Sequence, residues 1–233
     1  MTQWLASVTD VYEALMVLEA GADIVDLKNP QQGALGALPL PVIAEITQQM
    51  NGIRPVSATV GDLPMVPSKL AEAVLQTAAT GVDIVKVGIF GHEGHAECIH
   101  AMRPLTARIR IVAVLFADAA PDFSLVSQLA QTGFHGVMLD TAVKNGRRLR
   151  DHCTDDDLRR FVEAARSLNL LTGLAGSLAI EDIQPLSEFG ANYLGFRSAL
   201  CQDLDRNTSI DRKKLMQLKE VLHSCNTRSK VLV

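Results

Sequence analysis

An acidic and a basic side chain stand two residues apart near the end of an apolar segment. In the stretch GADIVDLKNPQQGALGA, residues 21–37, Asp26 and Lys28 follow a run of small and β-branched residues. Side chains two residues apart in a strand point to the same face. The pattern predicts a buried strand that presents a carboxylate and an amine together, just before a glycine-rich loop. Taken alone, the pair is equally typical of a structural ion pair.

This type of segment recurs three more times, as GVDIVKVG (81–88), GFHGVMLD (133–140) and GANYLGFR (190–197). Each copy opens with a glycine suited to a helix C-terminus and then runs into an apolar strand. In the aligned copies, the sixth residues are Asp26, Lys86, Met138 and Gly195, and the eighth are Lys28, Gly88, Asp140 and Arg197. Charges at single strand ends are often only solvated. Four strands in register favour a shared functional site.

The elements that must position these residues alternate regularly along the chain. Apolar strand-like runs are expected at 3–8, 22–28, 55–60, 82–88, 109–116, 135–140, 170–175 and 192–197. Amphipathic helical segments are expected after each, near 10–20, 41–50, 67–80, 95–107, 122–132, 154–168, 178–189 and 210–224. Eight such units predict an α/β fold, a single-domain (β/α)8 TIM barrel over residues 1–233, with its site at the carboxyl ends of the strands. A doubly wound open sheet shares the same alternation and remains the alternative.

A lysine at the mouth of a barrel can attack a carbonyl as a free amine and hold the substrate as an iminium. A second cation nearby favours the free amine, and Lys86 is the expected cation. A carboxylate beside Lys28 would instead hold it protonated. Asp26 is therefore expected to serve as a proton shuttle or to orient the second lysine.

Two glycine-containing loops suggest phosphate binding. LAGSL (174–178) ends the seventh expected strand and GFRSA (195–199) ends the eighth, where phosphate-binding barrels place their anion site. Gly176 and Ser177 can offer backbone N–H groups, Gly195 lies in the adjoining strand, and Arg197 can form a bidentate clamp. Tight turns also need glycine, so each loop alone is weak evidence.

Three further stretches carry polar groups at expected strand ends. SATVGD (57–62) contains Asp62, FADA (116–119) contains Asp118, and LDTAVKNG (139–146) adds Lys144 after Asp140. The two aspartates are also typical of helix or turn caps. Lys144 is equally well explained as a solvated loop charge.

The stretch GHEGHAECIH (91–100) contains three histidines but lacks the H-E-x-x-H spacing of a metal-binding helix. His92 and His95 can share a face, yet no second ligand cluster is evident. We expect exposed loop histidines and no catalytic metal, and no cofactor is predicted.

Composition excludes several classes of protein. The chain has 233 residues, a net charge of -4 and 4% aromatic residues, which argues against a nucleic-acid partner. It shows no secretory leader and no uncharged apolar run of membrane-spanning length. Four scattered cysteines without C-x-x-C spacing suggest free thiols in a reducing cytosol. A cytoplasmic protein is expected.

Five stretches, in order and spacing, resemble the (5-formylfuran-3-yl)methyl phosphate synthase family. They are GADIVDLKNPQQGALGA, VSATVGD, VDIVKVGIFG, MLDTAVKNGRRL and LAGSL, and the resemblance runs from about residue 5 to the region of Asp211. The D-x-K-N-P-x-x-G-x-L-G-A string is highly specific. In the last strand region this chain departs from the family, with Ser198 where a glycine is usual.

The resemblance implies a metal-independent barrel lyase of the class I aldolase type. Such an enzyme joins two molecules of glyceraldehyde 3-phosphate, with loss of phosphate and water, into the furan precursor of methanofuran. It implies Lys28 as the Schiff-base residue and Lys86 as the proton-transferring residue. Asp26, Asp140 and Lys144 match the supporting charged residues of the family's site.

Two other interpretations remain open at this point. Another imine-forming aldolase acting on a phosphosugar would need nearly the same site. A catalytically silent phosphosugar sensor would bind the ligand but would not need a reactive Lys28. In each case the partner is a small phosphosugar, and a homo-oligomer is expected because barrels of this size commonly assemble.

Overall fold

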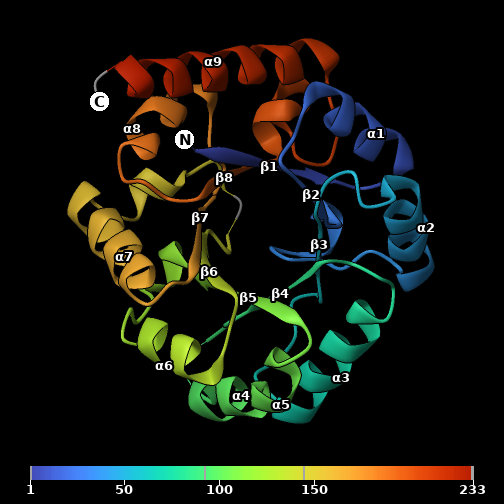
Figure 1. The fold of residues 1–233 in the computed structure, drawn as a ribbon, viewed down its shortest axis with the longest axis vertical. Coiled ribbons are helices and arrows are strands. Elements are labelled where there is room, and N and C mark those ends of the chain that lie inside the picture. Colours follow the sequence, from blue (N-terminus) through green and yellow to red (C-terminus); the bar gives the residue numbers. More distant parts are fainter. Residues whose placement is uncertain (1, 92, 144, 232–233) are drawn as a thin grey trace.

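The structure, a computed structural model that describes residues 2–91, 93–143 and 145–231, is a closed parallel β-barrel surrounded by helices (Figure 1). Each strand pairs in parallel with the next, and β8 returns to pair with β1. The strands are β1 (Gln3–Val8), β2 (Ile24–Leu27), β3 (Val56–Thr59), β4 (Ile84–Gly88), β5 (Arg110–Phe116), β6 (Gly136–Asp140), β7 (Leu171–Leu174) and β8 (Tyr193–Phe196). Closure confirms the predicted TIM barrel and excludes the open sheet.

The helices form an outer ring around this barrel (Figure 1). They are α1 (Val11–Ala20), α2 (Leu40–Met50), α3 (Pro67–Ala78), α4 (His95–Ala101), α5 (Arg103–Thr106), α6 (Leu125–Thr132), α7 (Asp155–Ser167), α8 (Ile183–Ser187) and α9 (Arg212–Val231). The helix expected over 95–107 is interrupted after Ala101. Pro104, which lacks an N–H, lies in the first turn of the short α5.

Local sequence explains where helices begin and where they end before the next strand. Asp10 caps α1 by accepting from the backbone N–H of Glu13, while the carboxylate of Glu13 accepts the N–H of Thr9, so only one half of a capping box forms. The glycines that open the repeated segments all lie in the left-handed region, with φ of 91° at Gly21, 90° at Gly81, 93° at Gly133 and 75° at Gly190. A residue without Cβ is favoured there, which confirms their predicted role as helix stops.

Alternation along the strands divides the interior into two shells. In β2, Val25 and Leu27 join the large core between barrel and helices. Ile24 belongs instead to a smaller cluster inside the barrel, together with Leu5, Ile84, Val112 and Met138 among others. This apolar plug fills the barrel below Asp26 and Lys28, so the charged residues lie on top of it near the carboxyl ends.

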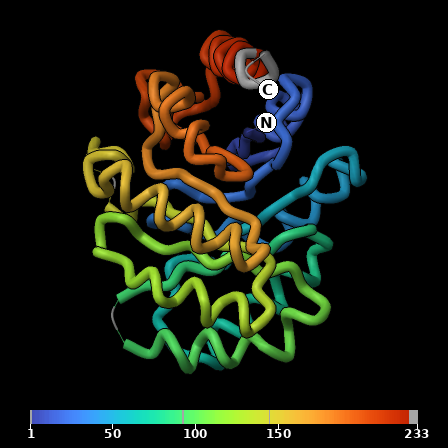
Figure 2. Tube along the Cα trace, turned by 60° about the vertical axis from the view of Figure 1, so that its left-hand side comes forward, coloured from blue at the N-terminus to red at the C-terminus, as the bar shows by residue number. Residues whose placement is uncertain are grey.

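The two ends of the chain meet on the opposite, amino-terminal side of the barrel. Helix α9 lies beside the start of β1, as Figures 1 and 2 both show, and Thr2 and Asn226 exchange hydrogen bonds of 3.0 and 3.1 Å. None of the helices in the described part of the chain has the length and apolar character needed to cross a membrane.

Candidate active site

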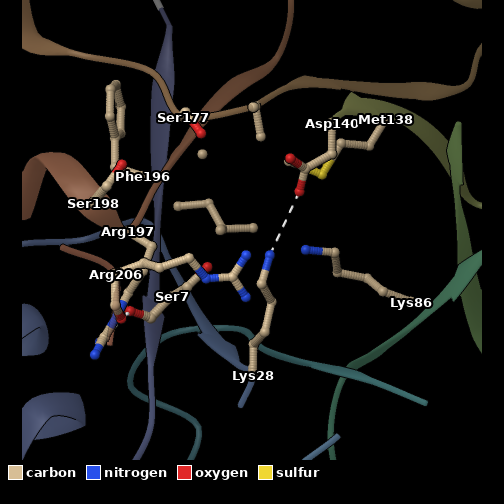
Figure 3. Close-up of a pocket in the computed structure, with 14 residues that line it drawn as sticks. Ser7, Lys28, Lys86, Met138, Asp140, Ser177, Phe196, Arg197, Ser198 and Arg206 are labelled. Carbon is tan, nitrogen blue, oxygen red and sulfur yellow. Dashed lines mark hydrogen bonds and ion pairs between the residues drawn. The ribbon is translucent and has the colours of Figure 1, made fainter. Parts of the chain in front are cut away.

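A cavity with about 440 Å³ of empty space, part of it open to solvent, lies at the carboxyl ends of the strands (Figure 3). Residues from both the sixth and the eighth positions of the repeated segments line it. Seven of the nine predicted site residues line it: Lys28, Lys86, Asp140, Gly176, Ser177, Gly195 and Arg197. Asp26 is hydrogen-bonded to Lys86, one of the lining residues. Lys144 lies outside the described residues. The four-strand register therefore assembles the predicted groups around one cavity.

Asp26 and Lys86 form a buried ion pair. The amine Nζ of Lys86 lies 3.0 Å from each carboxylate oxygen of Asp26. Ser7 and Ser57 donate their hydroxyls to the same carboxylate, at 2.9 and 2.6 Å. Two charges taken out of water are tolerated when their remaining hydrogen-bonding capacity is satisfied, as it is here. Of the two roles expected for Asp26, the geometry matches the orienter of Lys86.

The amine of Lys28 approaches a different carboxylate. Its Nζ lies 3.5 Å from Oδ2 of Asp140, at the long limit of a hydrogen bond, while Oδ1 of Asp140 accepts the backbone N–H of Thr141 at 2.7 Å. Lys28 and Asp140 are both buried. Figure 3 shows the amines of Lys28 and Lys86 pointing into the same space from β2 and β4. Asp26 therefore does not hold Lys28, although the two share a strand face.

The loop after β7 has the unusual backbone expected of an anion-binding turn. Gly176 and Ser177 both have positive φ, of 113° and 52°. A Cβ at Gly176 would approach Cγ2 of Thr141 to 3.0 Å. Gly195 is required for packing as well, because a Cβ there would lie 2.9 Å from Cε of Met138. Close approach thus explains both glycines, whether or not a phosphate binds.

Arg197 does not present the predicted clamp. Its guanidinium donates to the backbone carbonyls of Ser7, Arg206 and Thr208, and it forms an ion pair with Glu13. These contacts use four of the five N–H groups of the side chain, so one is left for a ligand. A bidentate grip on phosphate needs two. Arg197 instead connects the end of β8 to α1 and to the loop that follows β8.

Asp62 and Asp118, for which the sequence also predicts a capping role, each hold a loop in place at the mouth of the barrel. Asp62 accepts the backbone N–H groups of Ala34 and Leu35, both at 2.7 Å. This holds the loop after β2, and a Cβ at Gly33 would lie only 2.1 Å from the Asp62 carboxylate. Asp62 is therefore not a cap of its own helix or turn, because the N–H groups that it accepts belong to the loop after the neighbouring strand β2.

Asp118, at the end of β5, does the same for the loop after β6. Its two carboxylate oxygens accept the N–H groups of Ala142 and Val143, each at 2.7 Å. These two hydrogen bonds fix the start of the segment that leads to Lys144. The sequence shows an aspartate just past the end of a strand, but it does not show which loop that aspartate binds.

Three further residues that line the cavity had no role predicted from the sequence. Ser7 is placed by β1, opposite Asp26 in the β1–β2 register, and Ser198 and Arg206 come from the loop after β8. Hydroxyl groups on strands and arginines in loops are too common in sequences to single out without the topology.

The histidine-rich stretch lies away from this cavity. His95 begins α4 and its ring contacts the carbonyl of Phe90 at 3.1 Å, His100 is exposed, and His92 lies outside the described residues. No group of three or more histidine, cysteine or acidic side chains in the described ranges is arranged to hold a metal ion.

Comparison with known proteins identifies the family that matches this chain. A family model described as 4-HFC-P synthase matches residues 4–219. The chain is 39% identical to the (5-formylfuran-3-yl)methyl phosphate synthase of Methanopyrus kandleri, over 88% of this chain and 92% of the relative. It is 37% identical to the protein of the same name from Methanothermobacter thermautotrophicus, over 94% and 98%.

Solved structures support the architecture. Phosphoribosyl anthranilate isomerase from Thermus thermophilus superposes with a TM-score of 0.68 at 14% identity, covering 96% of this chain and 99% of that one. At this identity the likeness concerns the fold alone.

Proposed function

Because this chain belongs to the 4-HFC-P synthase family, we propose that it condenses two molecules of glyceraldehyde 3-phosphate into (5-formylfuran-3-yl)methyl phosphate through an imine on Lys28. The synthase role in methanofuran biosynthesis follows from the family. The substrate, the lyase-type chemistry and the imine are the proposal. The reaction balances when two triose phosphates yield one furan phosphate, one inorganic phosphate and two molecules of water.

The observation that carries this proposal is the pair of buried lysines facing one cavity, each beside its own carboxylate. In imine formation the lone pair of Lys28 Nζ attacks the aldehyde carbon, and the carbinolamine oxygen leaves as water. The resulting iminium acidifies the adjacent C–H, and loss of that proton gives an enamine. The enamine carbon then adds to the second aldehyde and forms the new C–C bond.

Lys28 must lose a proton before it can attack. The carboxylate of Asp140 favours the ammonium form of Lys28, whereas Coulomb repulsion from the ammonium of Lys86 favours the neutral amine. Asp140, 3.5 Å from Lys28, is placed to take that proton and to return it to the leaving oxygen.

Lys86 is proposed to transfer protons during the later steps. The aldol addition, the eliminations and the ring closure each move protons between carbon and oxygen atoms of the bound intermediate. An ammonium fixed by two contacts of 3.0 Å to Asp26 is held ready to donate to an oxygen in the cavity. Lys144 stays a predicted supporting residue, as implied by the family resemblance.

The loops after β7 and β8 are proposed to bind phosphate with Gly176, Ser177 and the neighbouring Ser198. These residues border the cavity that contains the two lysines, as the usual barrel phosphate site would require. Gly195 contributes by leaving room above Met138. The expected homo-oligomer and the cytoplasmic location remain predictions.

The test is product identification. Purified protein is incubated with glyceraldehyde 3-phosphate and excess EDTA, and the furan aldehyde phosphate is sought by mass spectrometry together with released phosphate. Its formation in EDTA supports the proposal and argues against an exchangeable metal. Formation of a different phosphosugar would favour another aldolase. Unchanged substrate, also after metals are added, would favour a phosphosugar sensor.

A further inference from the structure

Arg206 stands between the lysine cavity and a second, wider one. The outer cavity spans about 1290 Å³, part of it open to solvent, and lies over the loops after β2, β6, β7 and β8. The two cavities share Ser177, Ser198 and Arg206. Any molecule that passes from the outer cavity toward Lys28 therefore meets the arginine at the junction.

The arginine is held from one side only. Its Nη2 atom donates to the carbonyls of Pro30 and Gly33, at 2.8 and 2.6 Å, which ties the β8 loop to the loop that follows Lys28. Its Nε atom is buried, yet it has no acceptor among the described residues. A buried donor left without an acceptor costs free energy, and in a native site it often indicates a missing ligand or water.

Arg197 and Arg206 differ in how many of their N–H groups are already bonded to the protein. Arg197 spends four N–H groups on protein acceptors. Arg206 spends those of Nη2, and neither Nε nor Nη1 finds a partner in the described part of the chain. Guanidinium N–H groups directed into a cavity are the preferred ligands of phosphate oxygens.

We propose that Arg206 binds a substrate phosphate at the junction of the two cavities, beside Ser177 and Ser198. The identity of the substrate, a triose phosphate, rests on the proposed function. Arg206 would be the positively charged residue of the proposed phosphate site. Asp62 and Asp205 also border the outer cavity, but each already accepts backbone N–H groups, Asp62 from Ala34 and Leu35 and Asp205 from Asn207.

The electrostatic surroundings agree with an anionic ligand. Burial lowers the pKa of the Arg206 guanidinium, and the nearby carboxylate of Asp140 counteracts this. Arginine remains protonated in proteins, so the group carries a partly desolvated positive charge. A phosphate beside it would supply the acceptor that the buried Nε–H lacks among the described residues.

The first arm of the test needs no catalysis. Inorganic phosphate is titrated by calorimetry and by thermal shift into the wild type, Arg206→Gln and the control Arg160→Gln, which removes an exposed charge on α7. We expect Arg206→Gln to weaken phosphate binding about 10-fold or more while Arg160→Gln leaves it unchanged. Equal phosphate binding by wild type and Arg206→Gln would overturn the proposal.

The second arm separates ligand binding from a structural role. Trapping of the Lys28 imine by cyanoborohydride is compared for glyceraldehyde 3-phosphate and for glyceraldehyde, which lacks the phosphate. Arg206→Gln should lose the preference for the phosphorylated aldehyde and keep its reactivity with glyceraldehyde, and Arg206→Lys should recover part of the preference. An equal fall with both aldehydes would mean that Arg206 only supports the loop after β2. If the wild type forms no adduct, the proposed function fails, and the phosphate arm still decides the role of Arg206.

Discussion

The carboxylate of Asp26 is joined to the amine of Lys86, 60 residues away in sequence, rather than to that of Lys28 on its own strand. The pair is completely enclosed, with side chains 0% and 2% exposed, and two serines complete the coordination of the carboxylate. The amine of Lys28 instead lies 3.5 Å from Asp140. The two lysines of the cavity therefore contact different carboxylates.

The Asp26–Lys86 pair should behave as a unit in stability measurements. Asp26→Asn leaves a buried ammonium without a countercharge, and Lys86→Met leaves a buried carboxylate. We expect each single variant to lower the free energy of unfolding by about 3–5 kcal/mol. The double variant, in which both charges are gone, should lose much less than the sum, as measured by urea unfolding. Additive losses would show that the two groups are energetically independent. Arg160→Gln, at an exposed pair, should change stability by less than about 1 kcal/mol.

Lys86→Met also separates proton transfer from activation of Lys28. If Lys86 moves protons after the imine has formed, turnover should fall by roughly 10²- to 10⁴-fold, the usual contribution of a general acid or base, while an adduct on Lys28 can still be trapped. Measurement of both quantities on one preparation distinguishes the two roles. Loss of the trappable adduct would instead assign Lys86 to the activation of Lys28.

Asp118 is expected to act as a positioning residue. Its carboxylate is the bidentate acceptor for Ala142 and Val143, and Asp118→Asn replaces one of those acceptor oxygens with a donor. We expect a stability loss of about 1–2 kcal/mol with a clear fall in kcat, since the loop that leads to Lys144 loses its anchor.

The matched control for Asp118 is Asp122→Asn, a few residues further along. Asp122 accepts from the N–H and hydroxyl of Ser124, two residues further along its own loop. Its kcat should stay at the wild-type value. If Asp118→Asn and Asp122→Asn have the same kcat as the wild type, the brace has no role in positioning the site.

The sequence predicted the barrel well because its elements are locally encoded. The apolar runs matched every observed strand within about two residues, β1 and its prediction coinciding at 3–8. The repeated G-x-x-x-x-x-x-x segments marked both the helix stops and the inward-facing layers. Residue types that recur at fixed positions are visible in a single sequence. The charged residues that face the barrel interior could therefore be predicted from the sequence.

Pairing within that set could not be predicted, because it depends on stagger between strands and on the reach of long side chains. Ser57 lies opposite Asp26, and Lys86 lies opposite Thr59 on the next strand, yet the lysine side chain spans that offset. Likewise, Arg197 forms an ion pair with Glu13 of α1, which is 184 residues away in sequence. Both outcomes are tertiary, and neither follows from a motif.

The most direct test of the central claim is to trap the imine on Lys28. The protein is incubated with glyceraldehyde 3-phosphate, reduced with borohydride, digested and mapped by mass spectrometry, with Lys28→Ala and the exposed-lysine variant Lys69→Ala in parallel. We predict one adduct on the peptide that contains Lys28, equal in wild type and Lys69→Ala, and neither adduct nor turnover in Lys28→Ala. Near wild-type turnover by Lys28→Ala, or an adduct mapped to a different lysine, would contradict the account.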